Sequence, residues 1–106
     1  LFKISDQLVS TIPFRVYSRL ALRLAGDRID IASRLFNLSL EDAIALREIT
    51  EHTHSLRQGM DIVFEMMIQR DVTLGQLVQV LKEMERFDAL ALLTEAGYRD
   101  DNALGR

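Results

Sequence analysis

The hydrophobic residues of the chain recur with the period of an α-helix and not with that of a strand. From Phe14 to Leu93, apolar residues return three or four positions apart, so each stripe would fill one side of a helix. Sustained alternation of apolar and polar residues is missing, and so are the Asn-Gly and Asp-Gly turns of hairpins. The pattern therefore predicts an all-α fold.

Capping residues divide the first half of this pattern into three helices. Pro13 fits the first turn of a helix that Gly26 would end in the left-handed conformation. Asp27 would cap a second helix that stops at Asn37, and Ser39 with Asp42 a third. The residues that these helices are expected to bury are Phe14, Val16, Tyr17, Leu20, Ala21, Leu24, Ile29, Ala32, Leu35, Phe36, Leu40, Ala43, Ile44 and Leu46.

The second half predicts three more helices. Ser55 with Gln58 and Thr73 with Gln76 form capping boxes, and a last helix runs from about Arg86 to Ala96. Gly97 would stop that helix, and the polar tail that follows is expected to fray. The expected core residues here are Met60, Val63, Phe64, Met67, Ile68, Leu74, Leu77, Val78, Leu81, Leu90 and Leu93. Six helices with short connectors predict an antiparallel six-helix bundle.

Length and composition fit one domain of this kind. The chain has 106 residues, 48% of them hydrophobic, and no cysteine, which excludes disulfides and thiolate metal sites. No apolar run approaches the ~20 residues that cross a bilayer, and the start lacks the pattern of a secretory signal. Since the chain does not begin with methionine, we expect it to be part of a longer protein.

Catalytic and metal-binding patterns are missing from the sequence. His52 and His54 are the only histidines, and they fall in a predicted polar loop without further ligands. There is no phosphate-binding glycine loop, no nucleophile elbow and no calcium loop. Met60, Met67 and Met84 fall on helical stripes and are interpreted as core residues. We therefore expect no enzyme activity, no cofactor and no metal.

The charges are distributed unevenly along the chain. Residues 1–34 carry six basic and three acidic residues, a net +3, whereas residues 35–106 carry seven basic and 13 acidic residues, a net −6. Arg15, Arg19 and Arg23 are four apart and would line one side of the first helix, with Leu22 exposed among them. Such a surface can attract another copy or a relative head to tail, and the net charge of −3 disfavours nucleic acid.

Two segments resemble the death domain family. DRIDIASRLFNLSLEDAIAL, from Asp27 to Leu46, is similar to the family's second and third helices, with the Leu38–Ser39 capping step between them. VTLGQLVQVLKEMERFDALALL, from Val72 to Leu93, resembles the fifth and sixth helices, including the Arg-x-Asp step of Arg86 and Asp88. The resemblance covers residues 12–96, within one death-fold domain of residues 1–106 that has an N-terminal extension and a polar C-terminal tail.

Some positions depart from the death domain pattern. Arg28 occupies a place that holds tryptophan in many death domains, and Met66 or a neighbour replaces another tryptophan in helix 4. The sister death effector domain is the alternative, since GMDIVF from Gly59 to Phe64 resembles its helix 4. That family has an Arg-x-Asp-Leu motif, for which this chain has Ala89 in place of the leucine and Asp30 as the nearest acidic partner in helix 2.

The resemblance implies a cytoplasmic adaptor function without catalysis. Death-fold modules bind one another homotypically and asymmetrically in apoptotic and innate immune signalling, typically with helices 1 and 4 of one domain against helices 2 and 3 of the next. The first patch would comprise Arg15, Arg19, Leu22, Arg23, Asp61 and Glu65, and the second Arg34, Glu41, Asp42 and Glu48. Arg86 and Asp88 would add contacts or hold the bundle together. The alternative function is a structural or regulatory helical domain with a non-homologous protein partner.

Overall fold

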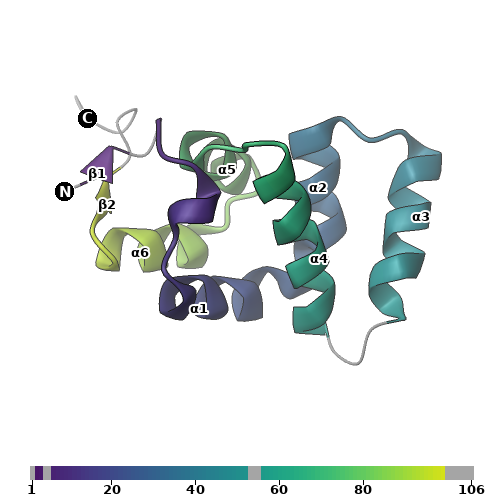
Figure 1. The fold of residues 1–106 in the computed structure, drawn as a ribbon, viewed down its shortest axis with the longest axis horizontal. Coiled ribbons are helices and arrows are strands. Elements are labelled where there is room, and N and C mark those ends of the chain that lie inside the picture. Colours follow the sequence, from purple (N-terminus) through teal and green to yellow (C-terminus); the bar gives the residue numbers. More distant parts are fainter. Residues whose placement is uncertain (1, 4–5, 53–55, 100–106) are drawn as a thin grey trace.

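The chain folds into packed helices joined by short connectors, as a computed structural model shows (Figure 1). The structure describes residues 2–3, 6–52 and 56–99. The α-helices are α1 (Phe14–Leu24), α2 (Arg28–Phe36), α3 (Leu40–Glu51), α4 (Leu56–Gln69), α5 (Leu74–Glu83) and α6 (Phe87–Glu95). Short 3₁₀ turns, η1 (Val9–Thr11) and η2 (Ala25–Asp27), flank α1 on either side. The predicted all-helical character is confirmed.

A small β element was not expected from the sequence. Strands β1 (Phe2–Lys3) and β2 (Tyr98–Arg99) pair in parallel, and Leu8 forms an isolated bridge with Thr73. These pairings bring the segment before α1 against the segment after α6 and the start of α5. Tyr98 is buried, so the prediction of a frayed tail is wrong for this residue, and the core extends beyond residues 12–96 to Val9 and Tyr98.

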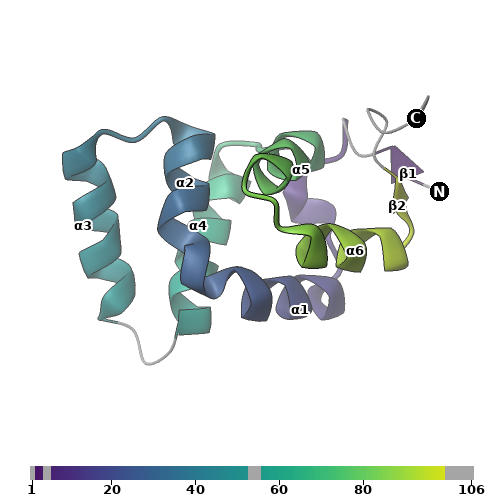
Figure 2. The same cartoon turned by 180° about the vertical axis from the view of Figure 1, so that it is seen from behind.

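The helices pack along the length of the molecule, from the strand pair at one end to α3 at the other (Figures 1 and 2). α1 packs against α6, and α5 contacts both α6 and α2. α3 stands at the opposite end from the strand pair and packs mainly against α2 and α4. This position leaves most of the surface of α3 uncovered.

Several caps were predicted correctly because they depend on neighbours in sequence. The Ser39 hydroxyl accepts a hydrogen bond from the Asp42 amide at 3.1 Å, and Thr73 and Gln76 form a complete capping box. Asn37 ends α2 with φ 52° in the left-handed region. Ser55, which was expected to cap α4, lies outside the described residues.

Two other predicted end signals are wrong. Gly26 does not take a left-handed conformation, because the chain continues from α1 directly through η2 into α2. Asp27 stands at the N-cap position of α2, but its side chain makes no capping hydrogen bond. Its carboxylate instead forms an ion pair with Arg86, at the start of α6.

Most of the predicted core is buried, with exceptions in α1 and α3. The stripes of α4 and α5 face the interior, from Met60 to Met67 and from Leu74 to Leu81. Phe14 is 73% exposed because it lies in the first turn of α1, at the edge of the buried arc. Leu40 and Ile44 are also exposed, so their predicted burial is wrong.

The reason for the exposure in α3 is its position. Leu46 and Thr50 are the buried residues of α3, and they face the two helices that contact it. Ile44 is two residues from Leu46, which places it about 160° around the helix. Its apolar side chain therefore points away from α2 and α4.

The two glycines at helix ends provide a test of backbone conformation. Gly97 has φ 99°, a conformation that side chains with a Cβ rarely adopt, so we expect Gly97→Ala to lower the free energy of unfolding by about 1 kcal/mol. A Cβ added at Gly26 would meet no atom within 4 Å, and Gly26 has no positive φ. Gly26→Ala should therefore raise the free energy of unfolding by about 0.5 kcal/mol. Urea denaturation of both variants measures the two changes in unfolding free energy. Equal changes would contradict the left-handed conformation assigned to Gly97.

Candidate interaction surfaces

The arginine stripe of α1 lies beside α6. Arg19 approaches Glu95 at 3.9 Å, and Arg23 approaches Asp88 at 3.8 Å. The four side chains are 41–66% exposed, so these ion pairs contribute little to stability. Arg15 forms no ion pair with a described residue. The stripe is therefore a solvated basic surface that two acidic residues of α6 partly neutralise.

Asp61 and Glu65 lie on the other flank of α1. Asp61 accepts a hydrogen bond from the Tyr17 hydroxyl, and the Tyr17 ring packs against Phe64 of α4 at 4.1 Å. Tyr17 is about 160° around α1 from Arg19. Glu65 is exposed, one turn after Asp61 on α4. Among the described residues, neither carboxylate forms an ion pair with the arginine stripe, and Asp61 contacts the side of α1 that carries Tyr17.

Leu22 is 69% exposed, as predicted. The structure adds the exposed Phe14, which lies eight residues earlier and about 80° around α1 from Leu22, on the flank away from the arginine stripe. This flank lies between the arginine stripe and the side that carries Tyr17. An apolar surface with basic residues at one edge suits protein contacts better than an isolated leucine would.

Arg34 is separated from the acidic residues with which it was grouped. Its guanidinium binds Asp30 at 2.9 Å and Glu83 of α5 at 3.5 Å. The hydrogen bond with Asp30 raises the pKa of Arg34 above its ordinary value. Arg34 therefore lies on the α5 side of α2, while α3 packs elsewhere along α2 and α4.

The acidic surface is concentrated on α3. Glu41, Asp42 and Glu48 are exposed, and none of them forms an ion pair with a described residue. With Glu51, α3 carries four acidic residues against one basic residue, Arg47, a net charge of −3. Leu40, Ile44 and Ile49 are exposed on the same helix at 77, 50 and 58%. The α3 surface is thus both acidic and apolar.

A charged cluster joins α6 to the turn between α1 and α2. The Arg86 guanidinium pairs with Asp27, donates to Asp88 through Nε and Nη2 at 3.2 Å each, and donates to the Arg23 carbonyl at 2.7 Å. The hydrogen bond from Arg86 lowers the pKa of Asp88 below its ordinary value. Asp30, the acidic partner expected from the sequence, binds Arg34 instead.

A buried polar cluster attaches α3 to α2. Arg28 is only 5% exposed, and its Nε donates to the Thr50 hydroxyl at 2.8 Å. A second guanidinium hydrogen bond reaches the Ala25 carbonyl at 3.1 Å. Because arginine is rarely buried, this role could not be predicted from the residue type. Arg28 holds the place where the resemblance expects a tryptophan, and it is buried as a tryptophan would be.

The histidines, the acidic residues and the cavities are the other features that could form a site. Among the described residues, no three His, Cys, Asp or Glu side chains are grouped as metal ligands. The His52 ring contacts the Glu48 carbonyl at 2.5 Å, at the end of α3, and His54 lies outside the described residues. The described helices all fall short of the length and apolarity needed to cross a membrane. Two cavities indent the surface, one between α1 and α6 and one between α2 and α5.

Comparison with known proteins gives no relative of this chain. No family model, no curated protein and no solved structure matches it.

Proposed function

We propose that this domain is a non-catalytic signalling module of the death-fold superfamily that binds other death-fold domains. The support is the resemblance of residues 27–46 and 72–93 together with helices α1 to α6, whose order is the one that the resemblance implies. In this proposal the helices form the six-helix antiparallel bundle of that superfamily. The domain would act in the cytoplasm, in apoptotic or innate immune complexes.

The observation that carries the proposal is the pair of unlike surfaces on α1 and α3. α1 presents a basic stripe with the exposed Leu22, and α3 presents a net charge of −3 with the exposed Leu40 and Ile44. These surfaces lie on different parts of the molecule (Figure 1). Because the surfaces differ, contact between them is heterologous and can continue from one domain to the next.

Within the superfamily, the contacts of Arg86 support a death effector domain more than a death domain. The resemblance to that family requires an Arg-x-Asp step with an acidic partner near helix 2, and Asp27 provides this partner. The arginine at position 28, where many death domains have tryptophan, is a further departure from the death domain pattern. Death effector domains are therefore the first partners to test.

Charge reversal tests the proposal. We expect Arg19→Glu and Glu48→Arg each to weaken binding to a death-fold partner, or to a second copy, roughly tenfold, because each places like charges at the contact. Combining a Glu48→Arg domain with an Arg19→Glu domain should restore part of the loss. Light scattering and pull-down assays at low and high salt measure the association.

Asp6→Arg is the control, since it makes the same charge change as Glu48→Arg at an exposed residue outside both surfaces. If neither reversal nor salt alters any association, the charged surfaces are not the binding surfaces. A domain that stays monomeric and binds no death-fold protein would favour the alternative, a structural or regulatory domain with a non-homologous partner.

A further inference from the structure

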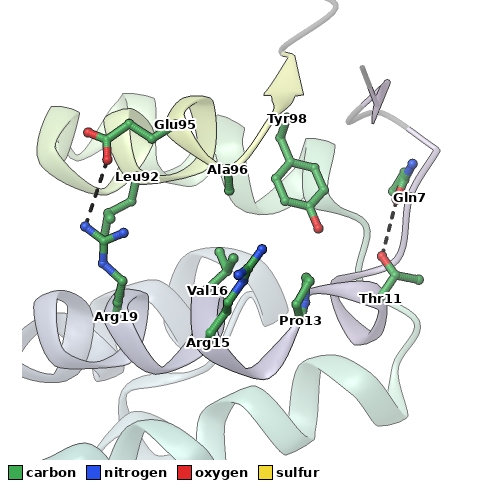
Figure 3. Close-up of a pocket in the computed structure, with 10 residues that line it drawn as sticks. All are labelled: Gln7, Thr11, Pro13, Arg15, Val16, Arg19, Leu92, Glu95, Ala96 and Tyr98. Atoms are coloured by element: carbon green, nitrogen blue, oxygen red, sulfur yellow. Dashed lines mark hydrogen bonds and ion pairs between the residues drawn. The ribbon is translucent and has the colours of Figure 1, made fainter.

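A cavity of about 640 Å³ lies between α1, α6 and the segment that precedes α1 (Figure 3). This volume falls within the range of small-molecule sites. Val16 of α1, Leu92 of α6 and Ala96, the residue that follows α6, contribute its apolar wall. Arg15, Arg19, Glu95 and Tyr98 contribute the charged and polar groups, so the cavity combines an apolar surface with a few polar side chains.

The charge of the lining is positive. Arg15 and Arg19 each carry +1 and Glu95 carries −1, so the ionised groups of the cavity sum to +1. The Arg15 guanidinium points up from α1 into the space below α6 and Tyr98 and forms no ion pair with a described residue (Figure 3). Arg19 is held by Glu95 at 3.9 Å in a largely exposed pair, which a competing anion can displace.

Tyr98 also lines the same cavity. Its ring is 6% exposed, and its hydroxyl points toward α1 (Figure 3). Burial raises the pKa of the phenol above its ordinary value. Tyr98 therefore adds an uncharged polar group to the wall of the cavity at neutral pH.

We propose that this cavity binds a small organic monocarboxylate with an aliphatic body. The carboxylate would lie at Arg15 and the aliphatic part against Val16 and Leu92. The net charge of +1 matches one carboxylate, whereas a phosphate monoester, which carries close to two negative charges at neutral pH, would leave excess negative charge beside Glu95. The cavity shares Arg15 and Arg19 with the basic stripe of α1, so the proposal is tested on the isolated domain, without a death-fold partner.

Octanoate is the probe, and octanol and octylamine are controls with the same aliphatic body and no negative charge. We expect octanoate to shift the amide resonances of Val16, Leu92 and Ala96 in ¹⁵N–¹H spectra of the dilute domain. Octanol and octylamine should bind at least tenfold more weakly. Equal binding of octanol, or shifts confined to α3, would overturn the proposal.

Three variants distinguish binding by the charged residues of the cavity from attraction by the overall charge of the domain. Arg15→Gln should weaken octanoate binding tenfold or more, because it removes the cation that no described carboxylate neutralises. Arg47→Gln, which removes an exposed arginine of α3 outside the cavity, should leave the dissociation constant unchanged. Glu95→Gln should tighten binding severalfold, since it raises the lining charge to +2. Unchanged binding in Arg15→Gln, with the fold verified by circular dichroism, would contradict the assignment.

Discussion

Replacing Thr50 by valine is expected to lower the free energy of unfolding by about 2–3 kcal/mol. Thr50 is 1% exposed, and its hydroxyl accepts the hydrogen bond from Arg28 Nε at 2.8 Å. Valine has nearly the same shape, so the substitution leaves no cavity. It does leave a charged donor of a buried guanidinium without its acceptor, and burial of an unsatisfied charged group is costly.

Thr94→Val is the matched control for this experiment. The Thr94 hydroxyl donates to the Leu90 carbonyl within α6, just as the Thr50 hydroxyl donates to the Arg47 carbonyl within α3, but Thr94 is exposed. We expect an effect within about 0.5 kcal/mol for Thr94→Val. Urea denaturation compares the two variants, and similar losses would show that the hydrogen bond with Arg28 adds nothing.

Hydrogen exchange gives this prediction a second readout. The bond between Arg28 and Thr50 joins α2 to α3, which otherwise packs along α2 and α4 without further helices around it. Loss of the bond should therefore raise exchange rates in α3 more than in α5. Uniform loss of protection across the domain would instead indicate that α3 has no separate stability.

Gly59 shows how closely this cluster is packed. A Cβ at Gly59 would lie 3.0 Å from Arg28 Nε and 3.1 Å from Thr50 Cβ. Glycine in a helix is unfavourable relative to alanine by about 1 kcal/mol, so its presence within α4 fits the space that the guanidinium occupies. In the sequence, GMDIVF is notable only for its resemblance to the death effector domain, and the physical role of its glycine follows from the packing.

Local features of the fold could be predicted because they depend on residues close in sequence. The caps at Ser39 and Thr73 and the left-handed Asn37 and Gly97 each involve residues within one helical turn. The apolar stripes of α4 and α5 also follow from the helical period, because these helices are covered widely by others. All of these features were visible without knowledge of the tertiary structure.

Features that depend on which helices are neighbours could not be predicted in this way. The spacing of the apolar residues in α3 predicts a helix, but it does not indicate how many other helices cover that helix. Because α3 packs mainly against α2 and α4, the predicted burial of Leu40 and Ile44 is wrong. Asp27 had the sequence position of a cap, and only the fold brings Arg86 beside it. In the same way, only the fold brings Asp61 to Tyr17 and Arg34 to Glu83.

Replacing Arg86 by methionine is expected to lower the free energy of unfolding by about 1–2 kcal/mol at pH 7. The variant loses the ion pair with Asp27, the two hydrogen bonds to Asp88 and the bond to the Arg23 carbonyl. The estimate is modest because Asp27 and Asp88 are 38 and 41% exposed, and water replaces part of the lost interaction. Arg47→Met, at an exposed arginine of α3, should change stability by less than 0.5 kcal/mol.

The pH dependence separates the ionic part of this effect from packing. Arg86 lowers the pKa of Asp88 in the folded state, so the unfolded state binds the proton more readily. The resulting stabilisation is present above the ordinary pKa of an aspartate, near 4, and is lost as the pH falls through the lower folded-state value. The difference in unfolding free energy between the wild type and Arg86→Met should therefore shrink between pH 6 and pH 3. The bond to the Arg23 carbonyl does not titrate in this range, so a difference that stayed constant would assign the whole effect to that bond and to packing.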